Sequence, residues 1–243
     1  MITLHHTTAS AVREHAAWAA THILVLGILN STVGLGPGGW IAGMAYTVAT
    51  VALVAGALAR SGGRLGPADR VTLGRGVLVA AVTALIVDRL GQDVPTALLV
   101  ALAAVALTGD FVDGQVARRT GTATAFGARF DMEVDAFLIL ALSVQVSLTH
   151  GPWVLVIGGI RYAFVAASWW LTWLRAPLPH SMARKVVAAV QGVVLTIAAA
   201  GIVPLSGLLV ELALLSLLWS FGRDTAWLWR RAVATLEGST SHV

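Results

Sequence analysis

The chain has 243 residues, of which 57% are hydrophobic and only 12% are charged, and its formal net charge is +4. About a quarter of the residues of a soluble domain are charged, so this composition excludes a disordered chain, a secreted disulfide-rich scaffold and an ordinary soluble enzyme. The sequence contains no cysteine, which also excludes disulfides, zinc–thiolate centres, iron–sulfur clusters and thiol nucleophiles.

Several stretches of the chain have the length and apolar character of a membrane-spanning helix, which takes roughly 20 mostly apolar residues. In chain order they lie at 16–36, 39–59, 71–90, 95–117, 126–148, 152–174, 184–202 and 205–222. Turn-forming pairs such as Gly36-Pro37 and Gly151-Pro152 separate them. Such segments suit only a helical bundle, so the sequence predicts an all-α integral membrane protein with about eight transmembrane helices. The first stretch is longer than the apolar region of a signal peptide, and we expect it to be retained.

The basic residues alternate between the connections of these predicted helices. All but Arg89 and Arg161 of the 16 lysine and arginine residues lie on one side, counted from Arg13 before the first stretch to Arg230 and Arg231 after the last. This alternation follows the positive-inside rule. It predicts a multi-pass protein of the cell membrane with both termini in the cytoplasm, and it explains the basic charge without a nucleic acid partner.

Four aspartates in the middle of the chain are spaced so that they meet. Asp110 and Asp113 are three residues apart near the cytoplasmic end of the fourth stretch, and Asp131 and Asp135 are four apart near the cytoplasmic start of the fifth. Each pair therefore shares one face of its helix. A short loop between antiparallel neighbours would bring both pairs together at the cytoplasmic membrane boundary.

Two interpretations of this acidic cluster are open from the spacing alone. Carboxylates at membrane depth normally face a cavity, a partner or a metal. The nearby Arg118, Arg119 and Arg129 would neutralise them in one interpretation. In the other, the oxygen-only ligands hold a hard divalent cation such as magnesium, manganese or calcium.

The residues around the cluster form a recognisable motif. Asp110-Phe-Val-Asp113-Gly114-Gln-Val-Ala117-Arg118 is followed after eight residues by Gly127, and then at intervals of three residues by Asp131 and Asp135. This resembles the full signature of the CDP-alcohol phosphotransferase family, also called CDP-alcohol phosphatidyltransferases. The resemblance covers the third to eighth stretches, which look like the six-helix core of that family.

The resemblance implies a division of the chain into three parts. We expect an N-terminal extension with two transmembrane helices at 1–60, a six-helix catalytic membrane core at 61–223 and a cytoplasmic tail at 224–243. The tryptophans and arginines at the start of the tail are typical of a segment at the membrane interface.

The resemblance also implies roles for the motif residues. The expected ligands of two Mg²⁺ or Mn²⁺ ions are Asp110, Asp113, Asp131 and Asp135, and Asp135 is also the expected general base. The expected nucleotide-binding residues are Asp110, Gly114, Ala117, Arg118 and Gly127. Small side chains at these glycine and alanine positions would leave the helix face open to the nucleotide, and an arginine offers charge-assisted hydrogen bonds to phosphate.

Other basic residues are candidates for binding the acceptor or a phosphate group. They are Arg75, Arg161, Arg184 and Lys185. Thr72-Leu-Gly-Arg75 resembles a threonine–arginine element of the family, and Lys185 with Gln191 resembles a basic element before its fifth core helix. For Arg161, an internal ion pair with Glu133 or Glu211 is an equally open interpretation.

The predicted function is therefore that of a membrane-embedded transferase of phospholipid biosynthesis. It would move a phosphatidyl group from a CDP-alcohol, with CDP-diacylglycerol as the expected donor, to a small polar alcohol and release CMP. A homodimer is an expectation from the family. The alternatives are a cation- or proton-coupled transporter that uses the acidic cluster, and a catalytically inactive relative with a scaffolding role.

Overall fold

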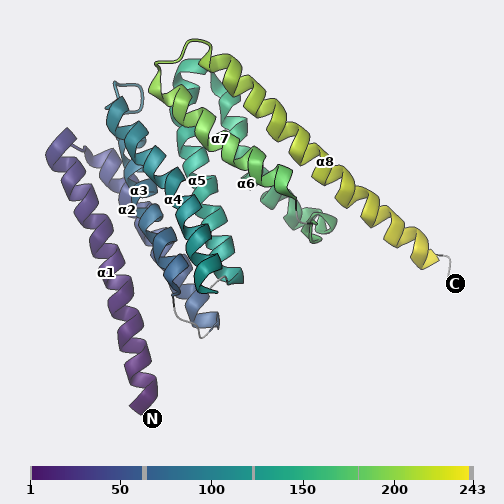
Figure 1. Ribbon diagram of the computed structural model, residues 1–243, viewed down its shortest axis with the longest axis horizontal. Coiled ribbons are helices and arrows are strands. Elements are labelled where there is room, and N and C mark those ends of the chain that lie inside the picture. The colour runs from purple at the N-terminus through teal and green to yellow at the C-terminus, as the bar shows by residue number, and fades with distance from the viewer. Residues whose placement is uncertain (1, 62–64, 122–123, 180, 241–243) are drawn as a thin grey trace. The chain divides into compact units, whose positions relative to one another are not determined.

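The computed structural model of the protein describes residues 2–61, 65–121, 124–179 and 181–240, which contain helices and no strand. Arg64 lies outside the described residues, and so do the side chains of Arg13 and Arg60. The α-helices are α1 (Ile2–Val33), α2 (Pro37–Ser61), α3 (Pro67–Asp88), α4 (Thr96–Thr120), α5 (Ala125–His150), α6 (Leu155–Trp170), α7 (Met182–Ala200) and α8 (Ser206–Thr240) (Figure 1). The short 3₁₀-helices η1 (Pro152–Val154) and η2 (Thr172–Arg175) flank α6.

Eight helices of this described part are long and apolar enough to cross a membrane, by length and composition. The prediction of an all-α, multi-pass membrane protein is thereby confirmed. The chain divides into two compact units, Met1–Ala141 and Leu142–Val243, and the boundary falls within α5.

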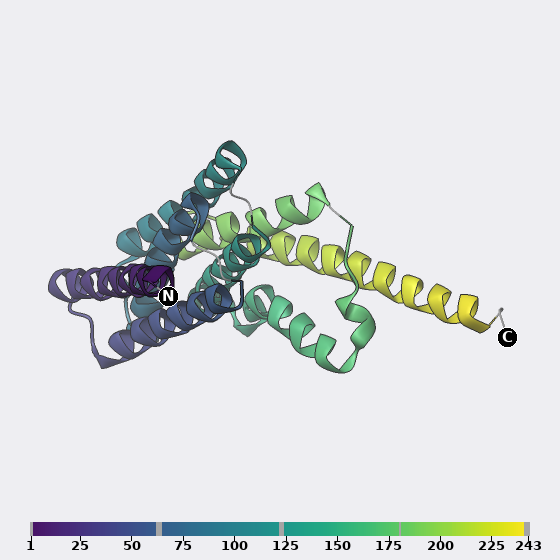
Figure 2. The same cartoon turned by 90° about the horizontal axis from the view of Figure 1, so that it is seen from below.

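In the first unit, α3 is the most enclosed helix. Its residues 79–86 are all buried, because α1, α2 and α4 pack against it. Figures 1 and 2 both show α1 and α2 alongside α3. Leucines of α1 and the α1–α2 connection meet small residues of α3 in one apolar cluster, formed by Leu26, Leu29, Leu35, Ala81, Ala84 and Leu85.

In the second unit, α7 and α8 pack along each other (Figure 2). Gln191 of α7 is buried and donates to the carbonyl oxygen of Ala213 on α8 at 3.0 Å, and its amide nitrogen lies 3.3 Å from the hydroxyl of Ser216. A buried polar contact of this kind fixes the register of two apolar helices.

The predicted stretches and the observed helices differ clearly in three places. Helix α1 begins at Ile2, well before the predicted start at residue 16. The sixth stretch, 152–174, is interrupted: α6 ends at Trp170, and Arg175 covers its last carbonyls by donating to Ser168 at 2.8 Å. The last helix does not end near residue 222 but continues to Thr240. Backbone hydrogen bonds form within a helix, so this more polar end can stay helical outside an apolar environment.

Candidate active site

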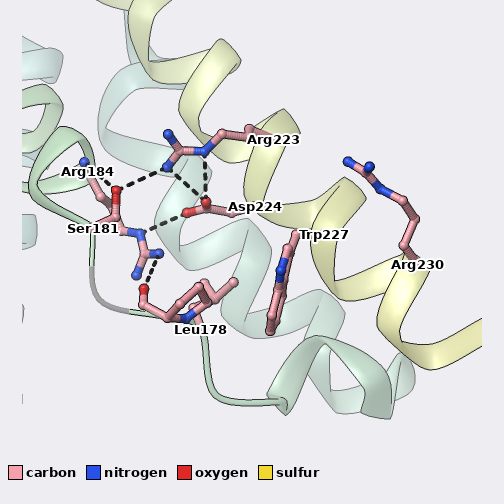
Figure 3. A pocket seen from close by; sticks show the side chains of 8 residues that line it. Leu178, Ser181, Arg184, Arg223, Asp224, Trp227 and Arg230 are labelled. Atoms are coloured by element: carbon pink, nitrogen blue, oxygen red, sulfur yellow. Dashed lines mark hydrogen bonds and ion pairs between the residues drawn. The ribbon is translucent and has the colours of Figure 1, made fainter. Parts of the chain in front are cut away.

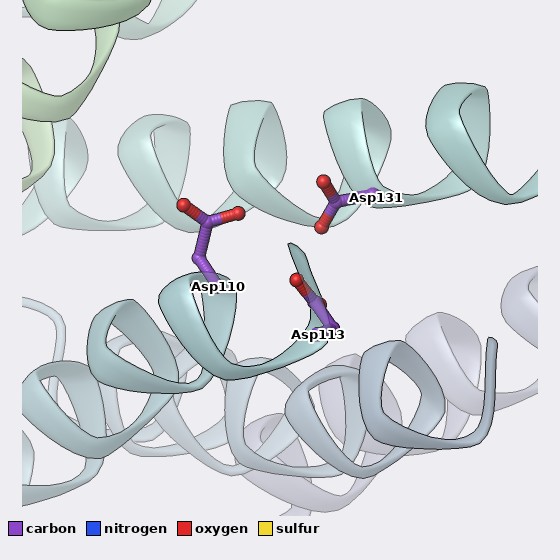
Figure 4. A group of neighbouring side chains, drawn as sticks. All are labelled: Asp110, Asp113 and Asp131. Atoms are coloured by element: carbon purple, nitrogen blue, oxygen red, sulfur yellow. The ribbon is translucent and has the colours of Figure 1, made fainter. Parts of the chain in front are cut away.

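The two predicted aspartate pairs meet in the first unit. Asp110 and Asp113 come from α4 and Asp131 from α5, and one carboxylate oxygen of each lies within 4.8 Å of the others (Figure 4). Asp113 is buried, whereas the side chains of Asp110 and Asp131 are 46% and 31% exposed. The cluster is therefore closed on the side of Asp113 and open on the side of Asp110, where a soluble group can approach.

A buried arginine from a third helix joins the aspartates. Arg75 of α3 donates through one terminal nitrogen to Asp113 at 2.7 Å, lies 3.5 Å from Asp110 and also contacts Asp131. Its other terminal nitrogen contacts Asp135. One planar guanidinium thus links α3 to carboxylates of both α4 and α5.

The helix α3 supplies a second contact to the most buried aspartate. The hydroxyl of Thr72 lies 3.1 Å from the same Asp113 oxygen that receives Arg75, and 3.2 Å from the carbonyl oxygen of Ala68. Thr72 and Arg75 are three residues apart, so they present their polar groups on one face of α3. Asp113 is held in place by two side chains of the neighbouring helix.

Arg75 reaches the cluster across the surface of α4, and a glycine makes room for it. A Cβ atom on Gly109 would lie 2.8 Å from Cγ of Arg75, a distance at which one of them must move. The Nε atom of Arg75 donates to the carbonyl oxygen of Ala106 at 2.9 Å. Arg75 and Ala106 are 31 residues apart in the sequence, so the spacing of residues along one helix does not predict their contact.

Gly127 marks a second close approach, between α5 and the start of α3. A Cβ atom on Gly127 would lie 2.4 Å from Oδ1 of Asp69, a buried residue. The other Asp69 oxygen accepts the backbone N–H of Gly66 at 2.8 Å, which caps α3. Gly127 is a predicted nucleotide-binding residue, whereas no sequence pattern pointed to Asp69.

The remaining motif residues lie on α4 beyond Asp113. Gly114 and Ala117 are half-buried and Arg118 is exposed. The guanidinium of Arg118 folds back toward Gly114, 3.4 Å from where a Cβ atom would stand. This side chain lies beside the helix face at Gly114.

The interpretation in which local arginines neutralise the aspartates does not describe this site. Arg118, Arg119 and Arg129 are all exposed, and within the described part of the chain the ion pairs to the four carboxylates come from Arg75. Buried basic side chains pair with buried acids because both lose their hydration. Arg75 was predicted as a phosphate-binding candidate, and its contacts place it within the acidic cluster.

The other basic candidates belong to the second unit. Arg161 is half-buried on α6, and Lys185 is exposed on α7. Arg184 donates to Asp224 at 2.8 Å and to the carbonyl oxygen of Pro179 at 3.1 Å. Arg184, Arg223, Asp224 and Arg230 line a pocket of about 270 Å³, shown in Figure 3, in which Arg184 and Arg223 pair with Asp224 while the Arg230 guanidinium lies apart from it.

The donor set of the aspartate cluster fits a divalent metal ion. Four carboxylates face the single positive charge of Arg75, so the site carries an excess of negative charge. Sites with several carboxylate oxygens and no sulfur or nitrogen ligand suit Mg²⁺ or Mn²⁺. Three of the aspartates are already close enough together to share one ion, and Asp135 adjoins them through Arg75.

Comparison with known proteins gives one match. The model of the CDP-alcohol phosphatidyltransferase family matches residues 67–221, which is more than half of the chain and includes the whole aspartate cluster. The match begins at the first residue of α3 and leaves α1 and α2 outside. Neither a curated protein nor a solved structure matches the chain significantly.

Proposed function

The chain belongs to the CDP-alcohol phosphatidyltransferase family, and we propose that its donor is CDP-diacylglycerol and its acceptor a small polar alcohol. Members of the family transfer a phospho-alcohol group from a CDP-alcohol. The observation that carries the proposal is the convergence of Asp110, Asp113 and Asp131 within 4.8 Å, inside the matched region of a membrane protein. The product would be a phospholipid with a new headgroup, and CMP would be released.

Asp110, Asp113 and Asp131 would hold Mg²⁺ or Mn²⁺, and we propose two ions. When bound, such ions neutralise the charge of a diphosphate and of the departing phosphate. Arg75 and Thr72 support this site from behind, because both contact the buried Asp113. They keep the carboxylate of Asp113 in one orientation while the more exposed Asp110 faces the substrate side.

Asp135 would act as the general base. It accepts the proton of the acceptor hydroxyl, whose oxygen forms a new bond to the donor phosphorus. The bond from that phosphorus to the CMP oxygen breaks, and the electron pair leaves with CMP. Its side chain is one-third exposed and its carboxylate is oriented by Arg75, so a hydroxyl from solution can reach it. No covalent enzyme intermediate is required.

Asp110, Gly114, Ala117, Arg118 and Gly127 would bind the cytidine diphosphate part of the donor. The half-buried small residues leave the face of α4 open, and the Arg118 guanidinium lies next to Gly114. A guanidinium in that position can form charge-assisted hydrogen bonds with phosphate oxygens.

We propose further that the acceptor carries an anionic group. Among the described residues that line the pocket of the second unit, the arginines Arg184, Arg223 and Arg230 outnumber the single acid Asp224, and this excess of guanidinium groups suits a phosphate. Lys185 and Arg161 of the same unit are further candidates for this role.

We propose the cell membrane as the location, with both termini and the active site on the cytoplasmic side, and a homodimer as the assembly. The parts 1–60, 61–223 and 224–243 remain our proposed division into extension, catalytic core and tail. The family match favours this transferase over the alternative of a cation- or proton-coupled transporter that uses the same aspartates.

An acceptor panel tests the substrates. The purified protein is incubated with CDP-diacylglycerol and serine, inositol, inositol phosphate or glycerol phosphate, and the lipid products are identified by mass. We expect a product with a phosphorylated acceptor. Arg184→Gln should raise the KM for that acceptor and leave the KM for the donor unchanged.

The matched control for this variant is Arg119→Gln, which removes an exposed arginine of α4, a helix that does not line the pocket. A product formed only with a neutral acceptor would contradict the proposed anionic group but not the donor. The absence of any product from CDP-diacylglycerol would contradict the proposed donor.

A further inference from the structure

The first two helices lie outside the family match, yet they enclose the helix that carries Arg75. The match begins at residue 67, and α1 and α2 both pack on α3. Leu26 and Leu29 of α1 are buried together with Ala81, Ala84 and Leu85 of α3. The extension is therefore part of the same compact unit as the aspartate cluster.

Helix α2 approaches α3 at the distance of backbone contact. A Cβ atom on Gly39 would lie 2.9 Å from the carbonyl oxygen of Ala84, and one on Gly43 would lie 3.3 Å from the Ala84 side chain. Glycines four residues apart allow membrane helices to pack this closely. Such packing leaves α3 little freedom to tilt or slide.

The connection between α1 and α2 is also fixed to the end of α3. Arg89 donates to the carbonyl oxygens of Val33 at 2.7 Å and of Gly34 at 3.2 Å. The neighbouring Asp88 accepts the backbone N–H of Gly39 at 3.3 Å and pairs with Arg89 at 3.3 Å. These bonds hold the C-terminal end of α3, whereas Arg75 lies nearer to its N-terminal end.

Two side chains of the extension lie behind the active site. His22 of α1 is buried, its Nδ1 atom lies 2.9 Å from the carbonyl oxygen of Trp18, and it stands four residues before Leu26, on the face of α1 that packs against α3. The Tyr46 hydroxyl of α2 would lie 3.9 Å from a Cβ atom on Gly76. The ring of Tyr46 also packs on Phe137 of α5, with centroids 4.9 Å apart.

Gly76 directly follows Arg75, and Phe137 is two residues after Asp135. We propose that His22 and Tyr46 are positioning residues: they support α3 and α5 from behind, so that Arg75 keeps its contacts with the four aspartates. The extension would thereby be a built-in part of the catalytic scaffold. This inference rests on the proposed function, because it assigns the extension a role in the same site.

The variants that test it are chosen to fold. His22→Leu keeps an apolar side chain in the buried position and removes the polar ring, and Tyr46→Leu removes the ring contact with Phe137. Tyr46→Phe keeps that ring contact and serves as the conservative rescue. Leu24→Ala and Ile41→Ala are matched controls, because both side chains lie on the same two helices and are 63% and 70% exposed.

We expect His22→Leu and Tyr46→Leu to lower kcat by about 10-fold, with the KM for the CDP-alcohol within about twofold of wild type, because small misplacements act on the transition state. Both controls should keep the wild-type kcat. Tyr46→Phe keeps the ring contact with Phe137 and loses only the hydroxyl near Gly76, so its kcat should fall less than that of Tyr46→Leu. The decisive measurement is a double-mutant cycle with Arg75→Lys, read both as kcat and as the Kd for Mn²⁺ by calorimetry.

If the inference is correct, Tyr46→Leu changes kcat and the Mn²⁺ Kd in the wild-type background but has almost no further effect once Arg75 is lysine. If the kcat of Arg75→Lys is too low to measure, the Mn²⁺ Kd still shows whether the two substitutions are coupled. Equal effects in both backgrounds, or variants that behave like the controls, would overturn the inference. A wild-type protein that neither binds Mn²⁺ nor releases CMP would instead contradict the proposed function.

Discussion

The contacts of Arg75 determine how the acidic cluster is held together. A guanidinium has its donors in one plane, so it can reach carboxylates of two helices at once, which the point charge of a lysine cannot do. In this protein it contacts aspartates of α4 and α5 from a buried position on α3. Because a single positive charge cannot balance four carboxylates, the site retains the charge that a divalent ion requires.

The role of Asp135 is tested by Asp135→Asn. The amide keeps the shape of the carboxylate and a hydrogen-bonding oxygen for Arg75, but it cannot accept the acceptor proton. Loss of a general base typically slows a reaction by 10²–10⁴-fold, and we expect kcat for CMP release to fall by about that factor. Asp93→Asn, at an exposed position before α4, should leave kcat unchanged, and an Asp135→Asn enzyme of normal rate would exclude Asp135 as the base.

The close contact at Gly127 predicts that even a methyl group is harmful there. In Gly127→Ala the new atom would meet the Asp69 carboxylate at 2.4 Å, and Asp69 is fixed by its bond to the Gly66 N–H. Overpacking of this kind costs about 1–3 kcal/mol, so thermal unfolding in detergent should occur at a lower temperature and the KM for the CDP-alcohol should rise. Gly27→Ala, where nothing lies within 4 Å, is the control that should unfold like wild type.

At the scale of the helices, the packing of α2 on α3 leaves space for a side chain at Gly38 but not at the adjacent Gly39. Gly39→Ala would place a Cβ atom 2.5 Å from the side chain of Leu35, which packs in the same apolar cluster as α3, and 2.9 Å from the carbonyl oxygen of Ala84. Gly38→Ala would meet only the carbonyl oxygen of Val87 at 3.8 Å. We expect Gly39→Ala to lower the free energy of unfolding by about 1–3 kcal/mol and Gly38→Ala to be neutral. Equal unfolding temperatures for the two variants would show that the helices are not in close contact.

The helices and the aspartate cluster follow from local sequence patterns, whereas the partners of the cluster do not. Intervals of three and four residues predict a shared helix face, and Asp110, Asp113 and Asp131 do converge. The contact of Arg75 joins positions 38 and 56 residues apart in sequence, so only tertiary packing reveals it. The contact of Asp69 with Gly127 is likewise invisible to any local periodicity.

Hydropathy predicts the apolar part of a helix but not its polar ends. The extension of α8 beyond residue 222 is interrupted by pairs of charged residues at 223–224 and 230–231, and its helical state depends on hydrogen bonds within the backbone. The reverse holds at 171–175, where an apolar stretch is no longer α-helical because Arg175 covers the carbonyls at the end of α6.

At the scale of the whole molecule, the distribution of basic residues predicts the orientation in the membrane. The chain contains no cysteine, so single cysteines can be introduced without a background. Arg119→Cys, at the exposed end of α4, should react with a membrane-impermeant maleimide only after permeabilisation. Asp93→Cys, at the other end of that helix, should react in intact cells. The reverse pattern would place the aspartate cluster on the outer face.

The most direct test of the account is metal-dependent release of CMP from CDP-diacylglycerol by the purified full-length protein. We predict that wild type releases CMP with Mg²⁺ or Mn²⁺ and stops when EDTA removes the ion. Asp113→Asn, which alters the buried carboxylate that Thr72 and Arg75 hold, should be inactive while the protein still inserts into the membrane. Undiminished CMP release in the presence of EDTA, or by Asp113→Asn, would contradict the claim that these aspartates bind the ions of the reaction.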